Sequence, residues 1–231
     1  MTVRYALYYA PRRDEALAAV ASRWLGRFST LQSERLTEIT AEPRRYGFHA
    51  TLKPPMALAD SVSERDLLDA VGQFAYRQRP FTTPPLVLSE LSDFLALVLS
   101  APSPELQQLA DKCVVEFDAF RRPPTESELA RRRTARLTQR QDELLHRWGY
   151  PYVLDQWRFH LTLTGRIADP TERATMAKLL HQRFAAFVGQ PLEVRDLCVF
   201  RQPAADRPFI LLARYRLGGG RRLDSQVWQG T

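Results

Sequence analysis

The sequence predicts an α+β fold with two pseudo-symmetric lobes, each an antiparallel sheet packed with helices. Two nearly identical strings carry this prediction: Phe-His-Ala-Thr-Leu at 48–52 and Phe-His-Leu-Thr-Leu at 159–163. Each string lies in an apolar, strand-like run and is followed by a helical pattern and then by further strand-like runs. The repeated order indicates an ancient duplication within one bilobal domain over 1–231, with approximate repeats at 46–100 and 157–217.

Apolar periodicity and turn residues place the individual elements. Alternating or continuous apolar runs predict strands at 3–9, 46–53, 86–91, 95–99, 157–165, 192–200 and 208–216. Apolar residues at helical spacing predict longer helices at about 14–26, 61–75, 103–120 and 169–187. Residues 29–45 have weak periodicity around Pro43 and are predicted to be irregular.

Capping patterns predict where the two helices that follow the matched strings begin. Ser61 with Glu64, and Asp169 with Glu172, match the capping-box pattern, in which a short polar side chain and a carboxylate satisfy free backbone N–H groups. The faces expected to enter the core consist of Leu67, Leu68, Val71, Phe74 and Ala75 in the first helix, and of Met176, Leu180, Phe184 and Phe187 in the second.

A basic segment at 121–150 separates the two halves. Caps at Thr125 and Thr138 and a stop at Gly149 predict two short helices inserted between the lobes. The segment contains an arginine block formed by Arg131, Arg132, Arg133 and Arg136. The block fits phosphate binding and a solvated helical face equally well, so both interpretations stay open.

The composition is that of an ordinary globular protein, with 45% hydrophobic and 26% charged residues in 231. No apolar run approaches the about 20 residues that span a bilayer, and the first residues resemble a strand rather than a signal peptide, so a cytoplasmic location is expected. The net charge of +7, with arginine far in excess of lysine, favours partners that carry phosphate. Cys113 and Cys198 lie in apolar stretches and are expected to be buried thiols.

The matched strings place a histidine and a threonine on one face of a strand. Side chains at i and i+2 of a strand share a face, so His49 projects with Thr51, and His160 with Thr162, while the intervening apolar residues enter the core. Histidine titrates near neutrality, so two of them can serve as general base and general acid in phosphodiester hydrolysis. Threonine hydroxyls can donate to the nonbridging phosphoryl oxygens, where charge builds up in the transition state.

The same periodicity extends the candidate site. Lys53 and Arg158 share parity with the histidines and are predicted to contact the phosphate of a substrate. Thr164 shares this parity, as does Gly47, which either leaves space for a substrate or permits an unusual backbone conformation.

With its two His-x-Thr motifs in apolar strands, the sequence resembles the two-histidine (2H) phosphoesterase superfamily over nearly the whole chain. The context Arg-Tyr-Gly-Phe-His-Ala-Thr-Leu-Lys-Pro-Pro resembles the branch associated with bacterial phosphonate-utilisation gene clusters. The resemblance implies a central groove between the lobes, catalysis by His49 and His160 with Thr51 and Thr162, no metal or other cofactor, and cleavage of cyclic phosphates or RNA-end phosphodiesters. The expected partner is a small phosphorylated substrate or an RNA end, with no membrane, and the chain is expected to be a monomer.

Other interpretations remain open from the residues alone. A single His-x-Thr is usually structural, and the unmatched His146 and His181 are expected to be ordinary solvated or packed histidines. A metal-dependent hydrolase would need a third ligand beside the two matched histidines, and none is evident in the sequence. A nucleotide- or RNA-binding module would hold phosphate in the same groove without cleaving it.

Overall fold

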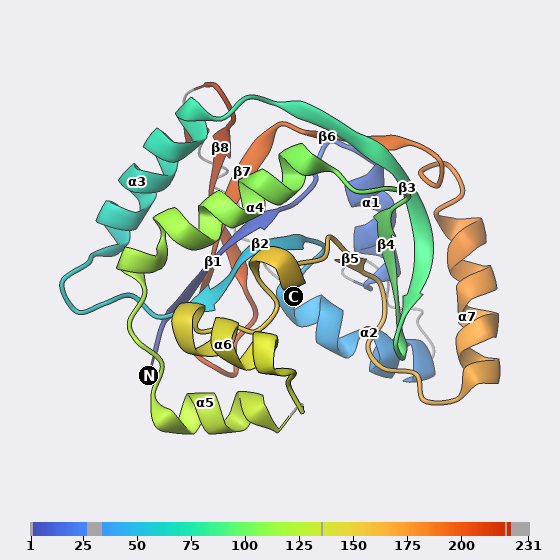
Figure 1. The fold of residues 1–231 in the computed structure, drawn as a ribbon. Helices are drawn as coiled ribbons and strands as arrows, with labels where there is room; N and C mark the ends of the chain where they lie inside the picture. The colour runs from blue at the N-terminus through green and yellow to red at the C-terminus, as the bar shows by residue number, and fades with distance from the viewer. Residues whose placement is uncertain (1, 27–33, 135, 220, 223–231) are drawn as a thin grey trace.

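The computed structural model describes residues 2–26, 34–134, 136–219 and 221–222. Two antiparallel sheets and the helices around them form an α+β fold, which confirms the predicted class (Figure 1). The first sheet has the order β2 (Ala50–Met56), β1 (Arg4–Tyr9), β7 (Asp196–Gln202), β8 (Ile210–Arg216), β9 (Arg221–Arg222). The second has the order β5 (Leu161–Thr162), β4 (Phe94–Leu99), β3 (Phe81–Leu91), β6 (Pro191–Val194).

Each sheet combines strands from both halves of the chain. The strand of the first motif, β2, pairs with β1, and β1 pairs in turn with the β7–β8 hairpin of the second half. The strand of the second motif, β5, pairs with the β3–β4 hairpin of the first half. The helices are exchanged too, because α3 (Glu64–Arg77) packs against β7 and β8 and α7 (Pro170–Arg183) packs against β3 and β4. Both motif strands, β2 and β5, stand at the end of their sheet's strand order. The main apolar core runs through both sheets.

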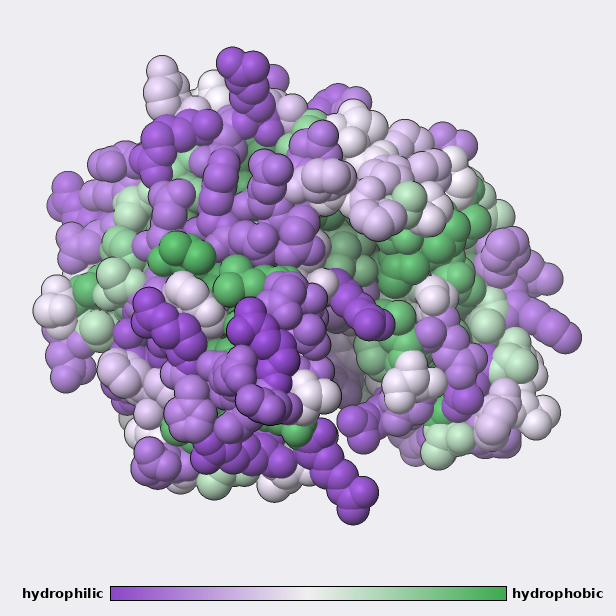
Figure 2. Space-filling view, viewed as in Figure 1, coloured by the Kyte–Doolittle hydropathy of each residue, from purple (hydrophilic) through white to green (hydrophobic). Residues whose placement is uncertain are grey.

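The remaining helices cover the sheets or form the insertion. They are α1 (Ala16–Trp24), α2 (Glu34–Tyr46), α4 (Pro104–Glu116), α5 (Glu126–Arg133) and α6 (Gln139–Trp148), with short 3-10 turns at Asp118–Phe120 and Leu154–Gln156. Thr125 and Thr138 form the predicted capping boxes of α5 and α6, and Gly149 ends α6 in the left-handed conformation. The two helices lie together at the lower left of Figure 1, where hydrophilic side chains cover them (Figure 2).

The predicted caps of the two helices after the motifs are corrected in detail. The capping box of α3 is formed by Ser63 and Asp66 instead of Ser61 and Glu64, although the predicted apolar face is buried as expected. Asp169 caps α7 by accepting from the backbone N–H of Thr171 at 2.8 Å. Glu172 does not complete a box there, because its carboxylate pairs with Arg35 at 2.6 Å.

Residues 34–46 form helix α2, where the sequence predicts irregular structure. Pro43 lies inside this helix and cannot donate to the carbonyl of Ile39, four residues earlier. The freed carbonyl accepts the backbone N–H of Gly165, just after the second motif. The proline therefore does not end the helix, because a tertiary hydrogen bond replaces the missing one. Residues 29–33 of the predicted irregular segment lie outside the described residues.

The strand boundaries differ from the predictions where tertiary pairing decides them. β2 runs through Pro54 and Pro55 to Met56, which a strand at the end of a sheet tolerates. The predicted strand at 157–165 is reduced to two paired residues in β5. The single run at 192–200 divides at Arg195 into β6 and β7, which belong to different sheets.

The two cysteines are buried free thiols, as predicted. Within the described parts of the chain, no helix combines the length and the apolar character needed to cross a membrane.

Lys53 is buried beneath β2 because the strand pairing is irregular. Tyr8 of β1 lies opposite Thr51, while Leu7 lies opposite Lys53, so one step along β1 matches two along β2. The Lys53 side chain is 1% exposed, and its ammonium donates to the carbonyl of Val114 at 2.9 Å. Burial lowers the pKa of Lys53 to about 8, against the opposing effect of Asp118. The predicted contact between Lys53 and phosphate is therefore wrong.

Replacing Lys53 with methionine should change how stability depends on pH. The unfolded chain binds the Lys53 proton more tightly than the folded chain, so this group makes the free energy of unfolding rise as pH increases from about 8 to about 10.5. The contribution amounts to up to ~3 kcal/mol. In urea unfolding across this range, wild type should gain stability relative to Lys53→Met. Parallel curves would contradict the expectation, and Lys112→Met, which removes an exposed lysine, is the matched control.

Candidate functional site

A cavity of about 1200 Å³ brings the two motifs together. Its walls come from β2, β5, the C-terminal end of α2, the β3–β4 turn and the insertion. His49, Thr51, His160 and Thr162 all line it. These four side chains are half-buried, whereas the neighbouring Phe48, Ala50, Leu52, Phe159, Leu161 and Leu163 are buried in the core. The alternation expected from strand geometry is therefore present around both motifs.

Both histidines are held by the same hydrogen bond. Nδ1 of His49 lies 2.9 Å from the carbonyl oxygen of Gly47, and Nδ1 of His160 lies 2.9 Å from that of Arg158. A carbonyl oxygen only accepts, so Nδ1 must carry the proton in each ring. Nε2 is consequently the basic nitrogen of both neutral imidazoles. Gly47 makes its carbonyl available from a left-handed conformation, with φ of 79°.

Thr51 lies directly beside the basic nitrogen of His49. Its hydroxyl oxygen is 3.3 Å from Nε2 of His49 and donates to it, because the proton of the ring is on Nδ1. A phosphoryl oxygen near this hydroxyl could accept the same proton instead. The first motif thus combines a proton acceptor and a hydrogen-bond donor within one small region of the cavity wall.

His49 lies in an aromatic environment that disfavours its charged form. The ring of Tyr8 stacks on it with a centroid separation of 3.9 Å and an interplanar angle of 26°, and Tyr46 and Phe200 lie further out. Burial lowers the pKa of His49 to about 4, the hydrogen bond to Gly47 opposes this shift, and the charge of His160 adds to it. The influence of His160 indicates that the two rings are within electrostatic reach of each other.

His160 is held in a less aromatic environment. The ring of Phe94 meets it edge-on at a centroid separation of 6.1 Å. Burial lowers the pKa of His160 below its ordinary 6.5, against the hydrogen bond to the Arg158 carbonyl. Both histidines are therefore neutral in the free protein at pH 7.

Two tryptophans fix the motif strands from the opposite half of the chain. The indole N–H of Trp157 donates to the carbonyl of Thr51 at 2.7 Å, and that of Trp24 donates to the carbonyl of Leu163 at 2.7 Å. Each motif backbone is thus held by a residue distant in sequence. The sequence did not predict a positioning role for either tryptophan. The one hint was that Trp157 lies three residues before His160.

The guanidinium of Arg158 does not take the predicted place in the cavity. Its side chain is exposed and is not part of the cavity wall, and only its carbonyl serves the site, as the partner of His160. Parity with His160 fails here because β5 begins at Leu161, so no strand geometry governs residue 158. Lys53 is likewise outside the cavity wall. Thr164 does belong to the wall, but its hydroxyl already accepts a hydrogen bond from the backbone N–H of Leu95 at 2.9 Å.

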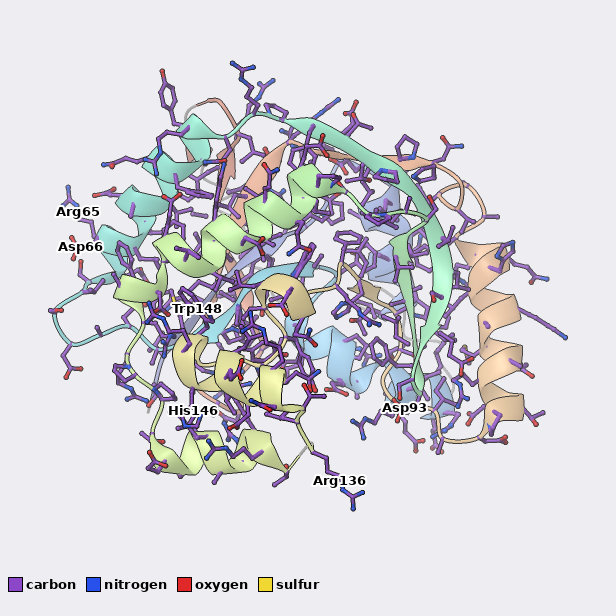
Figure 3. The ribbon with its side chains drawn as sticks, in the orientation of Figure 1. Arg65, Asp66, Asp93, Arg136, His146 and Trp148 are labelled. Atoms are coloured by element: carbon purple, nitrogen blue, oxygen red, sulfur yellow. The ribbon has the colours of Figure 1, made fainter. Side chains whose placement is uncertain are left out.

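Arginines dominate the charge of the cavity wall, which sequence reasoning did not predict in this form. The wall carries seven arginines and three carboxylates, and so has a positive field that favours anions. Of the arginine block, Arg131 and Arg132 line the cavity. Arg133 pairs instead with Asp142 at 2.7 Å, and Arg136 points away from the protein (Figure 3). The excess of arginine over lysine was the available signal.

The unmatched histidines are ordinary surface residues. His146 is exposed on α6 and lies 3.6 Å from a carboxylate oxygen of Asp142, whereas Trp148 lies on the other side of the helix (Figure 3). His181 is exposed on α7. Among the described residues, no group of three or more His, Cys, Asp or Glu side chains is arranged to hold a metal ion.

Two curated relatives match most of this chain. A protein of Janthinobacterium sp. (strain Marseille), named ribose 1,5-bisphosphate phosphokinase PhnN, is 39% identical and matches 94% of this chain and 51% of its own length. A protein of the same name from Laribacter hongkongensis (strain HLHK9) is 33% identical over 90% of this chain and 50% of its own. The chain therefore spans about half the length of the curated relatives it matches.

Solved structures give more distant likenesses. E. coli LigT complexed with NADP+ is 14% identical, with a TM-score of 0.48 over 95% of this chain and 100% of that one. Kluyveromyces marxianus Usb1 is 12% identical, with a TM-score of 0.36 over 91% of this chain and 97% of that one. Likeness at this level assigns no function.

A protein-family model described as "Protein of unknown function (DUF1045)" matches residues 51–210. The match begins at Thr51 and contains the whole second motif and the insertion. Because it covers more than half of the sequence, the chain belongs to the DUF1045 family.

Proposed function

We propose that this chain is a phosphodiesterase of the 2H superfamily that hydrolyses a cyclic phosphate or a related phosphodiester by acid–base catalysis, without a metal. The observation that carries the proposal is the duplicated hydrogen bond at Nδ1 of His49 and His160, which leaves two Nε2 atoms for chemistry in one cavity. A purely structural histidine would not need its second nitrogen in a cavity, nor a threonine hydroxyl beside it.

The reaction divides into two proton transfers at these nitrogens. Nε2 of one histidine removes a proton from water as the oxygen attacks phosphorus, and Nε2–H of the other donates a proton to the departing alkoxide. One P–O bond forms and one breaks, so diester and water give a phosphomonoester and an alcohol. Thr51 and Thr162 donate hydrogen bonds to the nonbridging oxygens as their charge increases.

His49 is the better candidate for the base, and His160 for the acid. Burial beneath its aromatic neighbours lowers the pKa of His49 to about 4, so its ring stays neutral and able to accept a proton over a wide pH range. A protonated His160 keeps Nδ1–H on the Arg158 carbonyl and gains the Nε2–H that a general acid needs. An anionic phosphoryl group beside His160 would favour that protonated form.

The substrate class is narrowed by the cavity charge and by the relatives. A wall rich in arginine suits a phosphorylated ligand over a neutral one. The relatives are named for a ribose bisphosphate, and the sequence resembles the branch associated with phosphonate utilisation, so a cyclic phosphate of a phosphorylated sugar in phosphonate metabolism is the first candidate. An RNA end is the alternative substrate. The same positive wall also fits a nucleotide- or RNA-binding module without turnover, which the assays below distinguish.

Removing either histidine should abolish most turnover, with different dependence on the leaving group. His49→Ala and His160→Ala should each lower kcat about 10²- to 10⁴-fold on a cyclic phosphate, because each removes a proton-transfer group. A p-nitrophenyl diester has a leaving group that departs without a proton, so His160→Ala should lose much less activity on it, whereas His49→Ala should lose similar activity on both. His146→Ala and His181→Ala are the matched controls. Near-normal turnover of the cyclic phosphate by either motif variant would contradict the proposed mechanism.

The pH profile of kcat/KM should be a bell centred below pH 6.5. On the acidic side, kcat/KM should fall as pH decreases towards about 4, because His49 becomes protonated. On the alkaline side, kcat/KM should fall as pH increases past the lowered pKa of His160, because this histidine loses its proton. The two apparent values belong to the coupled pair, so the profile tests the pair and not the assignment of roles. An optimum above pH 8 in steady-state assays would be inconsistent with two buried, neutral imidazoles.

Chelation should leave the activity unchanged, because protonation and hydrogen bonding alone carry the proposed steps. Prolonged incubation with EDTA followed by assay of a cyclic phosphate should retain the rate within about twofold. Full activity with EDTA separates this mechanism from the metal-hydrolase alternative. Loss of activity that zinc or manganese restores would assign the protein to the metal-dependent class instead.

A further inference from the structure

The positive charge of the cavity wall exceeds what one phosphodiester requires. Three of the seven wall arginines have a carboxylate partner: Arg121 pairs with Asp118 at 2.8 Å, Arg122 with Glu128 at 3.7 Å and Arg166 with Asp93 at 3.6 Å. A phosphodiester carries a single negative charge. Of the wall arginines that form no ion pair with the residues the structure describes, Arg131 and Arg132 belong to the insertion and not to either motif.

Arg121 lines the cavity and also carries a buried donor without a partner in the described part of the chain. Its Nε donates to Asp118 at 2.8 Å and one terminal nitrogen donates to the carbonyl of Arg147, but Nη1 is buried and has no hydrogen-bond partner within the described residues. The guanidinium fits closely against Gly149, where a Cβ would lie 3.0 Å from Nη1. The backbone of Arg121 is bridged to Leu58, beyond the end of β2. A buried unpaired donor is costly, which favours an acceptor supplied by a ligand.

Arg132 lines the cavity without an ion-pair partner among the described residues. Its guanidinium lies over the ring of Tyr150, 4.8 Å from the centroid, and forms no ion pair with any described carboxylate. Burial lowers the pKa of Arg132, as do the charges of Arg131 and Arg4, against the opposing effects of Tyr150 and Glu128. A guanidinium stacked on an aromatic ring keeps its edge available for bidentate contact with phosphate oxygens.

The two arginines and Tyr150 line the same cavity as His49 without belonging to its motif. Tyr8 stacks on His49. Burial is the main cause of the raised pKa of Tyr8, and the charges of Tyr46, Tyr150 and Arg4 also influence that pKa. Tyr150 in turn supports Arg132. A ligand with one phosphate beside His49 would therefore have a second binding region on the insertion within the same cavity.

We propose that Arg121 and Arg132, with Tyr150 as the stacking platform, form a subsite for a second phosphate monoester of the substrate. The inference rests on the proposed function for the position of the first phosphate. It assigns to the insertion a role in substrate selection: the enzyme should prefer a cyclic phosphate that also carries a terminal phosphate over the same compound without it. Each charge-assisted contact of this kind should contribute about 10- to 100-fold in affinity.

A binding experiment tests the subsite without any need for turnover. Titration calorimetry at fixed ionic strength compares ribose 1-phosphate with ribose 1,5-bisphosphate on wild type and on Arg132→Gln. Wild type should bind the bisphosphate at least 10-fold more tightly than the monophosphate. Arg132→Gln should bring the two affinities within about threefold, mainly by weakening the bisphosphate.

A variant on the same helix controls for the loss of charge. Arg133→Gln removes one positive charge from α5 at a residue that pairs with Asp142 outside the cavity wall, so it should keep the preference of the wild type. Equal affinity of wild type for the two sugars, equal weakening of both ligands by Arg132→Gln, or identical behaviour of the Arg132 and Arg133 variants would overturn the proposal. If wild type prefers the bisphosphate but hydrolyses no cyclic phosphate, the subsite stands and the proposed function fails.

Discussion

The two sheets of this protein are completed only by exchange of strands between the halves of the chain, and the candidate site depends on that exchange. β5 obtains its ladder from β4, and β1 connects β2 to β7. The indoles of Trp24 and Trp157 cross the same boundary in opposite directions to hold the motif backbones. Because each motif is held by elements of the opposite half, neither histidine can be positioned before both halves have folded together.

The tautomer of the two histidines follows from backbone geometry rather than from other side chains. In each motif the ring bonds to the carbonyl two residues earlier, so the backbone alone directs Nε2 outward. This arrangement needs no carboxylate beside the imidazole. Burial lowers the pKa of both histidines, and the backbone hydrogen bond opposes that shift without cancelling it. The same backbone explains why Gly47 adopts a positive φ just before the first motif.

Local patterns in the sequence predicted much of the structure, although the capping box of α3 lies at Ser63 and Asp66 instead of Ser61 and Glu64. Alternation around the motifs predicted which side chains line the cavity and which enter the core, and Thr125 and Thr138 predicted the helix starts of the insertion. Local patterns failed where a distant partner decided. Lys53 turns inward because β2 is irregularly paired with β1, and α2 continues through Pro43 because Gly165 supplies the missing donor. Such pairings leave no periodic signal in the chain.

The neutral histidines and the positive cavity wall are linked through the substrate. In the free protein, burial keeps both imidazoles uncharged in a wall that is already rich in arginine. An arriving phosphate offsets that positive field, so the pKa of His160 increases when the anion is present. The general acid would then be charged chiefly in the complex, where its proton is needed. Arg132 and Arg121 would bind a second phosphate without contributing protons, since guanidinium groups do not titrate in this range. The histidines would thus carry out the proton transfers, and the insertion would select the anion.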